Sequence, residues 1–496
     1  MIKTRFAPSP TGFLHIGSLR TALYSYLFAR QKKGNFILRI EDTDQTRYVE
    51  GAVESLLKTL NWAGLEYDEG PNPTNPNEKE IGENGPYIQS KRTALYLKHV
   101  EELLQKGHAY RCFCTPERLD QMRTEQQAKH LAPMYDKKCR YCSKEETDKL
   151  LAEKTPYVIR LAIPENETLR FHDVVRGDLK FESNLIDDQV LLKSDGFPTY
   201  HLANVIDDHF MGITHVIRGE EWLPSTPKHL YLYKAFGWTP PEFAHIPLLL
   251  NKDKTKLSKR QNDVAVEDYI AKGYLKEAMI NYIALLGWNP GEGSTQEIFS
   301  LDELIEKFNL ENVHKSGAIF DVERLNWMNG EYLRKLTVDD FAQRLLPWLE
   351  KTEWFTGEKT LETPYAKTAL KAVQTRIKTL ADAAPMLHYF LNDTIDYDLQ
   401  LLQSEKMKID AVIAKTALQA ARDDLNAHTD FSSEEAIKAC LVKTIERLGF
   451  KNGQVLWPLR MALTGQEFSP GAFEMIQILG KEKTLDRLDQ TLRILK

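Results

Sequence analysis

The first 70 residues constrain the fold most strongly, because strand-like and helix-like segments alternate there. Residues 2–7 form a short apolar run that ends in the loop sequence PSPTG, whose prolines and glycine do not continue a strand. Residues 17–33 repeat apolar side chains every three to four positions, as a helix does. A second apolar run at 35–41 and a second helical pattern at 49–63 follow. Such an alternation predicts an α/β fold with a parallel sheet and crossover helices.

Ligands of parallel sheets bind at the carboxyl ends of the strands, and the loop 8–17 and Glu41 both follow the end of a predicted strand. Short apolar runs return within 192–250 and fit a second half of the same sheet. The stretch 107–191, which contains four of the five cysteines, is therefore predicted to be an insertion. From about residue 265 onward the sequence has mainly helical periodicity.

Length and composition exclude several classes of protein. A chain of 496 residues is expected to form about three or four domains. Its net charge of −6 gives no general attraction to polyanions, and five cysteines argue against a secreted disulfide scaffold. No apolar run reaches the ~18 residues of a membrane span, and the N-terminus lacks the apolar segment of a signal peptide. We therefore expect a cytoplasmic protein that does not enter a membrane.

The loop 8–17 precedes a predicted helix and suits an anion. The helix that starts near Gly17 presents free backbone N–H groups and a partial positive charge. Gly17 has no Cβ, so a flat group can approach the backbone, and His15 can donate to a phosphate oxygen. A histidine two residues before a glycine is, on its own, better explained as part of an ordinary turn.

A charged segment, KDKTKLSKR, occupies residues 252–260. Its functional interpretation is a cationic loop that closes over phosphates, with Lys256, Lys259 and Arg260 supplying charge where a transition state becomes negative. Its structural interpretation is a solvated surface loop, which is favoured when the segment is considered alone.

Three further motifs carry polar groups at predicted strand ends or on a helix. RIEDTD at 39–44 could bind an amine or a metal, or could be a capping turn. Tyr200 and Asn204 are four apart, so a helix would place both on one face. Arg218 follows two β-branched residues and could bind a carboxylate through two N–H groups, or form an ion pair with a glutamate just after it.

Four cysteines form two close pairs, Cys112 with Cys114 and Cys139 with Cys142. In a cytosolic chain this spacing favours a structural zinc site over disulfides. Cys440 stands alone in a helical pattern and is predicted to be a buried apolar residue.

Taken together, these strings resemble the bacterial glutamyl–tRNA synthetases. FAPSPTGFLHIG matches the family's form of the class I "HIGH" signature, and RIEDTD, PTYHLAN, VIRGEEW and HIPLLLNKDKTKLSKR follow in the family's order. The last string contains the "KMSKS" signature, here with Leu257 and Arg260 at the variable positions. Further similar strings at 320–334 and 454–465 extend the resemblance over essentially the whole chain.

The resemblance implies a class I Rossmann-type catalytic domain that is split by an insertion and followed by helical connecting and anticodon-binding regions. The expected boundaries are 1–106 and 192–250 for the two catalytic halves, 107–191 for the acceptor-end-binding insertion, 251–330 for the KLSKR loop and helical connecting domain, and 331–496 for the all-helical anticodon-binding region.

The implied reaction uses ATP to convert L-glutamate into glutamyl-adenylate and then transfers glutamate to the 3′ end of tRNA(Glu). Activation usually requires bound tRNA in this family. Mg²⁺ is expected with ATP, held mainly by phosphates and water. We also expect a monomer. Arg376, in the predicted helix 365–382, matches a position where relatives that discriminate the anticodon carry arginine, although a solvated helix-face arginine is the alternative.

Site residues are carried over from the family by position. The catalytic set is His15, Gly17, Lys256 and Lys259; the ATP set is Ser9, His15, Gly17, Glu221, Leu249 and Lys259; and the glutamate set is Arg5, Ala7, Ser9, Glu41, Tyr200, Asn204 and Arg218. Zinc is expected on Cys112, Cys114, Cys139 and Cys142, with Tyr141 as the alternative fourth ligand. Some relatives bind no zinc, and in others the site reaches back to a tyrosine; Tyr135 lies four residues before Cys139.

Three other functions can be compared with the sequence. Glutaminyl–tRNA synthetases share the catalytic fold but carry β-barrel anticodon domains, whereas 331–496 has helical periodicity. A truncated relative that glutamylates a tRNA base lacks the C-terminal region. A non-catalytic tRNA-binding paralogue would be expected to have lost His15, Lys259 or Arg218, and all three are present.

Overall fold

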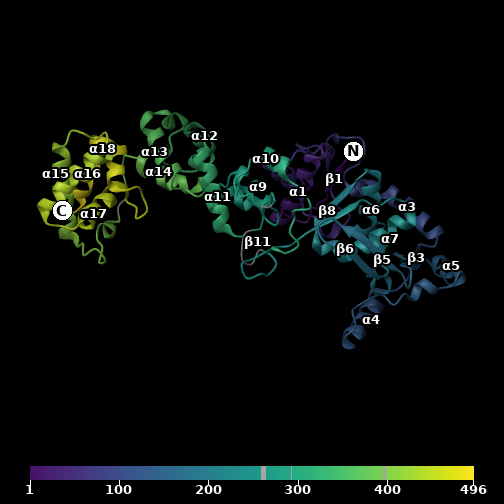
Figure 1. Ribbon diagram of the computed structural model, residues 1–496. Coiled ribbons are helices and arrows are strands. Elements are labelled where there is room, and N and C mark those ends of the chain that lie inside the picture. The colour runs from purple at the N-terminus through teal and green to yellow at the C-terminus, as the bar shows by residue number, and fades with distance from the viewer. Residues whose placement is uncertain (259–263, 292, 394, 396–397, 496) are drawn as a thin grey trace. The chain divides into compact units, whose positions relative to one another are not determined.

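The computed structural model describes residues 1–258, 264–291, 293–393, 395 and 398–495. These residues form two compact units. The first comprises 1–271 with 276–322, and the second comprises 272–275 with 323–496. Figure 1 shows strands and helices in the N-terminal part of the chain and helices in the C-terminal part. The α/β class and the helical C-terminal region agree with the prediction.

The predicted alternation at the start of the chain is confirmed. Strands β1 (Lys3–Phe6) and β2 (Asn35–Leu38) pair in parallel, with helix α1 (Ile16–Gln31) as the crossover between them. Helix α2 (Ala52–Ala63) then ends at Gly64, whose φ of 72° lies in the left-handed region that favours glycine. The loop between β1 and α1 therefore opens at the carboxyl end of β1.

A four-stranded sheet, in the order β6-β5-β9-β8, continues the fold. Its strands are β5 (Thr168–Asp173), β6 (Gly177–Glu182), β8 (His215–Gly219) and β9 (Glu242–Ile246). The β5–β6 hairpin falls within the predicted insertion, yet β5 pairs in parallel with β9. The N–H of Thr214, just before β8, donates to the carbonyl of Lys3 in β1 (3.0 Å), so β8 runs beside β1.

Helices α6 (Tyr200–Phe210) and α7 (Thr226–Phe236) flank β8 in sequence. The rest of the predicted insertion is a three-stranded antiparallel sheet, β3-β4-β7, with short helices. Its elements, with the helix that precedes them, are α3 (Thr93–Gln105), β3 (Ala109–Cys112), α4 (Pro116–Ala128), α5 (Lys144–Ala152), β4 (Val158–Leu161) and β7 (Val190–Leu192).

The first unit ends with short elements: β10 (Leu249–Leu250) paired with β11 (Ala318–Ile319), and helices α8 (Val266–Ala271), α9 (Lys276–Ala284) and α10 (Leu301–Lys307). The second unit is helical. It comprises α11 (Val322–Lys335), α12 (Val338–Leu349), α13 (Pro364–Gln374), α14 (Ala383–Leu391), α15 (Ala411–Ala427), α16 (Glu434–Leu448), α17 (Asn452–Thr464) and α18 (Ala472–Ile494).

The predicted helix over 365–382 is wrong in its C-terminal part. Helix α13 ends at Gln374, and the next turn starts at Thr379, whose hydroxyl and backbone N–H form a capping box with Asp382. Arg376 therefore lies in the turn after α13. In the described parts of the chain, no helix combines the length and the apolarity that a membrane crossing requires.

Candidate active site

A cavity of about 680 Å³ opens in the first unit, where the segments following β1, β2 and β8 meet the start of α6. Six of the seven residues predicted for glutamate line it: Arg5, Ala7, Ser9, Glu41, Tyr200 and Arg218. The seventh, Asn204, is buried one turn after Tyr200 in α6, and its amide nitrogen has no hydrogen-bond partner among the described residues. The structure therefore brings together groups that are as much as 213 positions apart in the sequence, Arg5 and Arg218.

A smaller cavity of about 240 Å³ adjoins the first and shares Gly219 and Glu221 with it. Its wall contains four more of the predicted residues, His15, Gly17, Leu249 and Lys256. Lys259 and Arg260 lie outside the described residues.

His15 is the N-cap of α1, and its Nδ1 accepts a hydrogen bond from the Gly17 N–H (2.9 Å). In the neutral ring the proton is then on Nε2, which makes that atom a donor. A Cβ on Gly17 would lie 3.3 Å from this imidazole, so a larger residue would crowd the ring. The sequence predicted both residues at a helix start, and the structure adds the hydrogen bond between them.

Arg218 forms the basic end of the larger cavity. Its side chain is buried, and its N–H groups donate to His245 Nε2 (3.0 Å), Thr226 Oγ1 (2.8 Å), Tyr200 Oη (3.2 Å) and His229 Nδ1 (3.2 Å). None of the described carboxylates lies within 4.0 Å of this guanidinium. The alternative that the sequence left open, an ion pair of Arg218 with Glu220 or Glu221, does not form, and Glu220 pairs with Arg176 at 2.5 Å.

The imidazoles beside Arg218 are held neutral. Burial, followed by repulsion from Arg218, lowers the pKa of His229 well below its ordinary value. Burial, with Lys228 and Arg218 as further causes, lowers the pKa of His201 to about 3. Neither imidazole therefore adds a positive charge beside the arginine.

The acidic end is built differently, from ion pairs. Arg39 is fully buried and donates to Glu41 Oε1 (3.0 Å) and Asp208 Oδ1 (2.7 Å), while Arg5 donates to the same Asp208 oxygen (3.2 Å). Burial raises the pKa of Glu41 to about 7, against the opposing effects of Arg39 and Arg5. Asp207 extends the set, since it accepts from Arg92 (2.7 Å) and lies 3.7 Å from Arg39.

Helix α6 contributes to both ends of the cavity. Tyr200 contacts Arg218, and Asp208, eight residues later, binds Arg5 and Arg39. The sequence predicted Tyr200 and Asn204 on one helical face but missed Asp208. The same four-residue spacing continued along the helix was the signal that could have found it.

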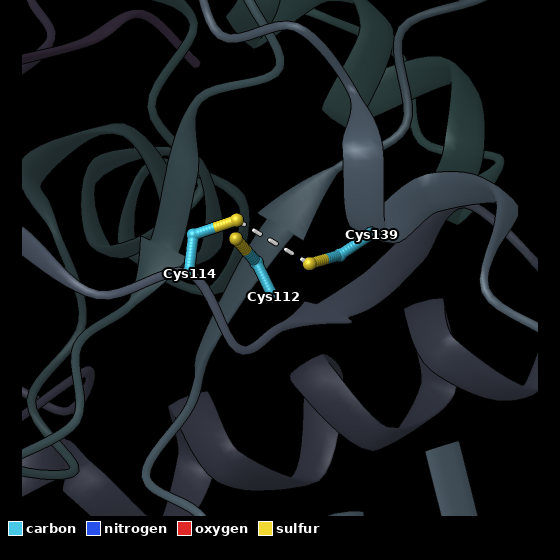
Figure 2. Close-up of side chains that lie close together, drawn as sticks. All are labelled: Cys112, Cys114 and Cys139. Carbon is cyan, nitrogen blue, oxygen red and sulfur yellow. Dashed lines mark hydrogen bonds between the residues drawn. The ribbon is translucent and has the colours of Figure 1, made fainter. Parts of the chain in front are cut away.

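The cysteines of the insertion converge only in part. The sulfurs of Cys112, Cys114 and Cys139 lie within 4.8 Å of one another and point toward a common centre (Figure 2). Cys142, the predicted fourth ligand, packs beside this cluster but is not part of it. Tyr141 is 69% exposed and donates to Glu165, so the structure does not bring the alternative ligand to the cluster either.

The hydroxyl of Tyr135 lies beside the three sulfurs. Its hydroxyl lies 3.3 Å from Cys112 Sγ and 3.4 Å from Cys114 Sγ, and it accepts from the Cys139 N–H at 2.9 Å. The spacing had placed Tyr135 near Cys139, but only the folded chain shows that its hydroxyl faces the sulfurs.

In the second unit, Arg376 donates to Glu474 Oε2 (2.5 Å) and to the Ala372 carbonyl (2.7 Å). Its side chain is about one-third exposed.

The chain matches two family models. Residues 1–327 match the catalytic domain of class I tRNA synthetases (E and Q), and residues 340–492 match an anticodon binding domain. A glutamate–tRNA ligase of Clostridium botulinum is 46% identical over 98% of this chain and 97% of its own length. One of Alkaliphilus metalliredigens is 45% identical over 98% of both chains. The crystal structure of a glutamate tRNA ligase from Elizabethkingia meningosepticum, in complex with its amino acid, superposes with a TM-score of 0.85 at 38% identity over both full chains.

Proposed function

The chain belongs to the glutamate–tRNA ligase family of class I tRNA synthetases, and from this premise we propose how its two adjoining cavities divide the work. The enzyme is a ligase that forms glutamyl-tRNA, and its substrates are glutamate, ATP and tRNA. In our proposal the larger cavity binds glutamate and the smaller one binds the adenosine and phosphates of ATP.

One observation carries the assignment of the larger cavity. A buried arginine without a carboxylate partner among the described residues and a buried carboxylate, Glu41, line the same space. L-glutamate carries the complementary pair of charges. Its side-chain carboxylate can pair with the guanidinium of Arg218, and its ammonium can donate to Glu41. Tyr200 and Asn204 supply further hydrogen bonds from α6.

The reaction then needs no covalent enzyme intermediate. The substrate α-carboxylate attacks the α-phosphorus of ATP, which breaks the bond to pyrophosphate and forms glutamyl-adenylate. A ribose hydroxyl at the tRNA 3′ end next attacks the acyl carbon, and AMP leaves. The protein contributes positioning and electrostatic stabilisation of the charge on the phosphates. Mg²⁺ bound to ATP neutralises part of this charge when present.

The residues of the smaller cavity suit the phosphate chemistry. His15 carries its proton on Nε2 and stands at the positive N-terminal end of α1, so it can donate to a phosphate oxygen. Lys256, in the wall of the same cavity, and Lys259 supply cations, while Glu221 and Leu249 are assigned to the adenosine. Ser9 stands in the larger cavity and is assigned to both substrates.

Pyrophosphate exchange tests this assignment. Purified enzyme should exchange pyrophosphate into ATP with glutamate and tRNA(Glu), and far more slowly when the tRNA is omitted. His15→Ala and Lys259→Ala should reduce the exchange by about 10²–10³-fold, mainly in kcat. A matched control is Lys272→Ala, because Lys272 lines neither cavity. Exchange that is equally fast in the His15 variant would overturn the role given to the α1 N-terminus.

We propose that zinc binds Cys112, Cys114 and Cys139, with Tyr135 as the fourth ligand. Three convergent sulfurs suit zinc, and a closed four-ligand site is the structural kind. Metal analysis should find about one zinc per chain. Cys112→Ser should lose the metal and lower the melting temperature of the insertion. Tyr135→Phe should weaken zinc binding, whereas the matched control Tyr141→Phe should not; the reverse result would reassign the fourth ligand.

The helical second unit is proposed to bind the anticodon of tRNA(Glu), with Arg376 as a candidate for discrimination against tRNA(Gln). The partial exposure of Arg376 supports this role, and its ion pair with Glu474 would have to open. Charging of both purified tRNAs by wild type and by Arg376→Gln tests it.

We further propose that the protein is cytoplasmic and monomeric. One unit of one chain supplies all described residues of the two cavities, so neither cavity needs a second copy. Light scattering, which measures the mass in solution, tests the monomer.

A further inference from the structure

Arg218 is held by groups that carry no charge of their own. The guanidinium Nε–H donates to His245 Nε2 at 3.0 Å, and its other N–H groups donate to a histidine, a threonine and a tyrosine. An ion pair with a protein carboxylate would hold the arginine more tightly. It would also neutralise the positive charge that the substrate carboxylate has to bind.

The protonation of His245 follows from its two neighbours. Arginine Nε is always a donor, so His245 Nε2 must accept and cannot carry a proton. The proton of the neutral ring is then on Nδ1, which lies 2.6 Å from Asp173 Oδ2. Both side chains are completely buried. Asp173 thus selects the one tautomer of His245 that can accept from Arg218.

Asp173 is itself fixed by the backbone. It is the last residue of β5, and its Oδ1 accepts from the N–H groups of Val175 (3.1 Å) and Arg176 (2.9 Å) in the turn that follows. The N–H of His245 in β9 also donates to this carboxylate (3.2 Å). Its second oxygen, Oδ2, therefore has a defined direction toward the imidazole.

We propose that Asp173 and His245 are positioning residues that orient Arg218 through a neutral acceptor and so keep its positive charge available for the substrate side-chain carboxylate. The proposal rests on the function given above to Arg218. Neither residue touches the substrate in this scheme. Their effect is on the direction of the guanidinium and on the charge that it presents to the cavity.

Asp173→Asn is the first test, because the structure dictates how the amide would sit. Two backbone N–H groups hold Oδ1, so the amide oxygen takes that position and the NH₂ group faces His245 Nδ1. The imidazole must then accept at Nδ1 and carry its proton on Nε2, where it meets the N–H of Arg218. Two facing donors should raise the KM for glutamate by about 10- to 100-fold, with a smaller change in kcat, and should narrow the preference for glutamate over glutamine.

A rescue variant separates positioning from simple structural support. Glutamine at position 245 offers an amide oxygen to Arg218 whatever stands at position 173. The double variant Asp173→Asn/His245→Gln should therefore recover part of the glutamate affinity that Asp173→Asn loses. If Asp173 only stabilises the fold, the double variant will be no better than the single one. Should Asp173→Asn fail to fold, His245→Gln and His245→Leu decide, since only the glutamine retains an acceptor.

The chain contains a matched control pair on the same hairpin. His172 Nδ1 lies 2.8 Å from Asp178 Oδ1, as in the buried pair, but both side chains are exposed and neither lines the cavity. Asp178→Asn should leave the KM and the glutamate preference unchanged. If Arg218→Gln abolishes the preference but Asp173→Asn and His245→Leu do not alter it, this inference fails while the proposed function stands. If Arg218→Gln leaves the preference intact, the role that the proposed function gives to Arg218 fails.

Discussion

At the acidic end of the cavity Glu41 is bound directly by an arginine, whereas at the basic end Arg218 is bound by neutral side chains. The acidic end contains three cations, Arg5, Arg39 and Arg92, and three carboxylates, Glu41, Asp207 and Asp208, so its charges balance. Near Arg218, the neighbouring carboxylate Asp173 is separated from the guanidinium by His245.

The difference shows which end can recognise charge. At the acidic end each charged side chain already has a partner of opposite charge. A bound ammonium therefore adds a positive charge to groups that already neutralise one another. The basic end has a buried cation, Arg218, whose charge is neutralised when a substrate carboxylate binds. Glutamine has the same shape as glutamate, but its side chain is neutral, so it cannot neutralise the charge of Arg218. We therefore expect discrimination at Arg218 and orientation of the substrate at Glu41.

Arg218→Gln should have the largest effect. It removes the cation, so glutamate loses a charged N–H donor and its counter-charge, and kcat/KM for glutamate should fall by about 10⁴-fold. The ratio of kcat/KM for glutamate to that for glutamine measures the change. Arg170→Gln, at an arginine that does not line the cavity, is the control. An unchanged ratio would shift the role toward Arg5, although Arg5 is bound to Asp208.

Asp208→Asn should break the balance of the acidic end. It removes the charge shared by Arg5 and Arg39 while both remain buried, and breaking such a buried pair costs about 3–5 kcal/mol in the free energy of unfolding. Denaturant unfolding measures the loss, with the exposed Asp178→Asn as the control. A loss below about 1 kcal/mol would mean that the ion pairs are not held as the structure shows them.

The double variant Asp173→Asn/His245→Glu should make the basic end resemble the acidic one. A carboxylate would then face Arg218 directly, and the asparagine avoids a like charge beside it. The substrate carboxylate must compete with this partner, so kcat/KM for glutamate should fall by about 10²-fold and the value for glutamine should fall less. Equal losses for the two amino acids would contradict the idea that the imidazole preserves the charge.

Lowering the pH should have the smallest effect, and it should act on one end alone. Burial raises the pKa of Glu41 to about 7, so its carboxylate becomes protonated as the pH falls from 8 to 6 and no longer pairs with the ammonium. The KM for glutamate should rise by about tenfold over this range. Arg218 stays charged, and the pKa of His245 is already lowered by burial.

Glutarate provides the matched probe, because it has both carboxylates but no ammonium. Its inhibition constant should not weaken between pH 8 and pH 6. A parallel weakening of glutarate and glutamate would place the titrating group at the basic end and would contradict the comparison.

Local patterns predicted the elements but not the partners of the charged side chains. The helix α1, the strand β2 and the shared face of Tyr200 and Asn204 follow from spacing within a few residues. The partners of Asp208 are 203 and 169 positions away, and Asp173 is 72 positions from His245. Spacing along the sequence carries no signal for such pairs, because the fold alone brings them into contact.

The cysteine site illustrates the same limit at short range. The pattern predicted the three cysteines that converge, but it placed Cys142 beside them where the structure has the hydroxyl of Tyr135. The short helix at Lys138–Tyr141 places Cys139 inside and turns Tyr141 to solvent, which periodicity did not reveal.

Helix α6 has a consequence for the length of the amino acid. Tyr200, at its first turn, contacts Arg218, the proposed partner of the side-chain carboxylate, and Asp208, eight residues later, binds Arg5 and Arg39 beside Glu41, the proposed partner of the ammonium. At about 1.5 Å per residue, positions 200 and 208 lie about 12 Å apart along the helix axis. Only an insertion or a deletion of residues in the helix would change this distance. The helix therefore fixes the distance between the two ends of the cavity. We therefore expect aspartate, which is one methylene shorter than glutamate, to bind one end of the cavity and to lose its contact with the other.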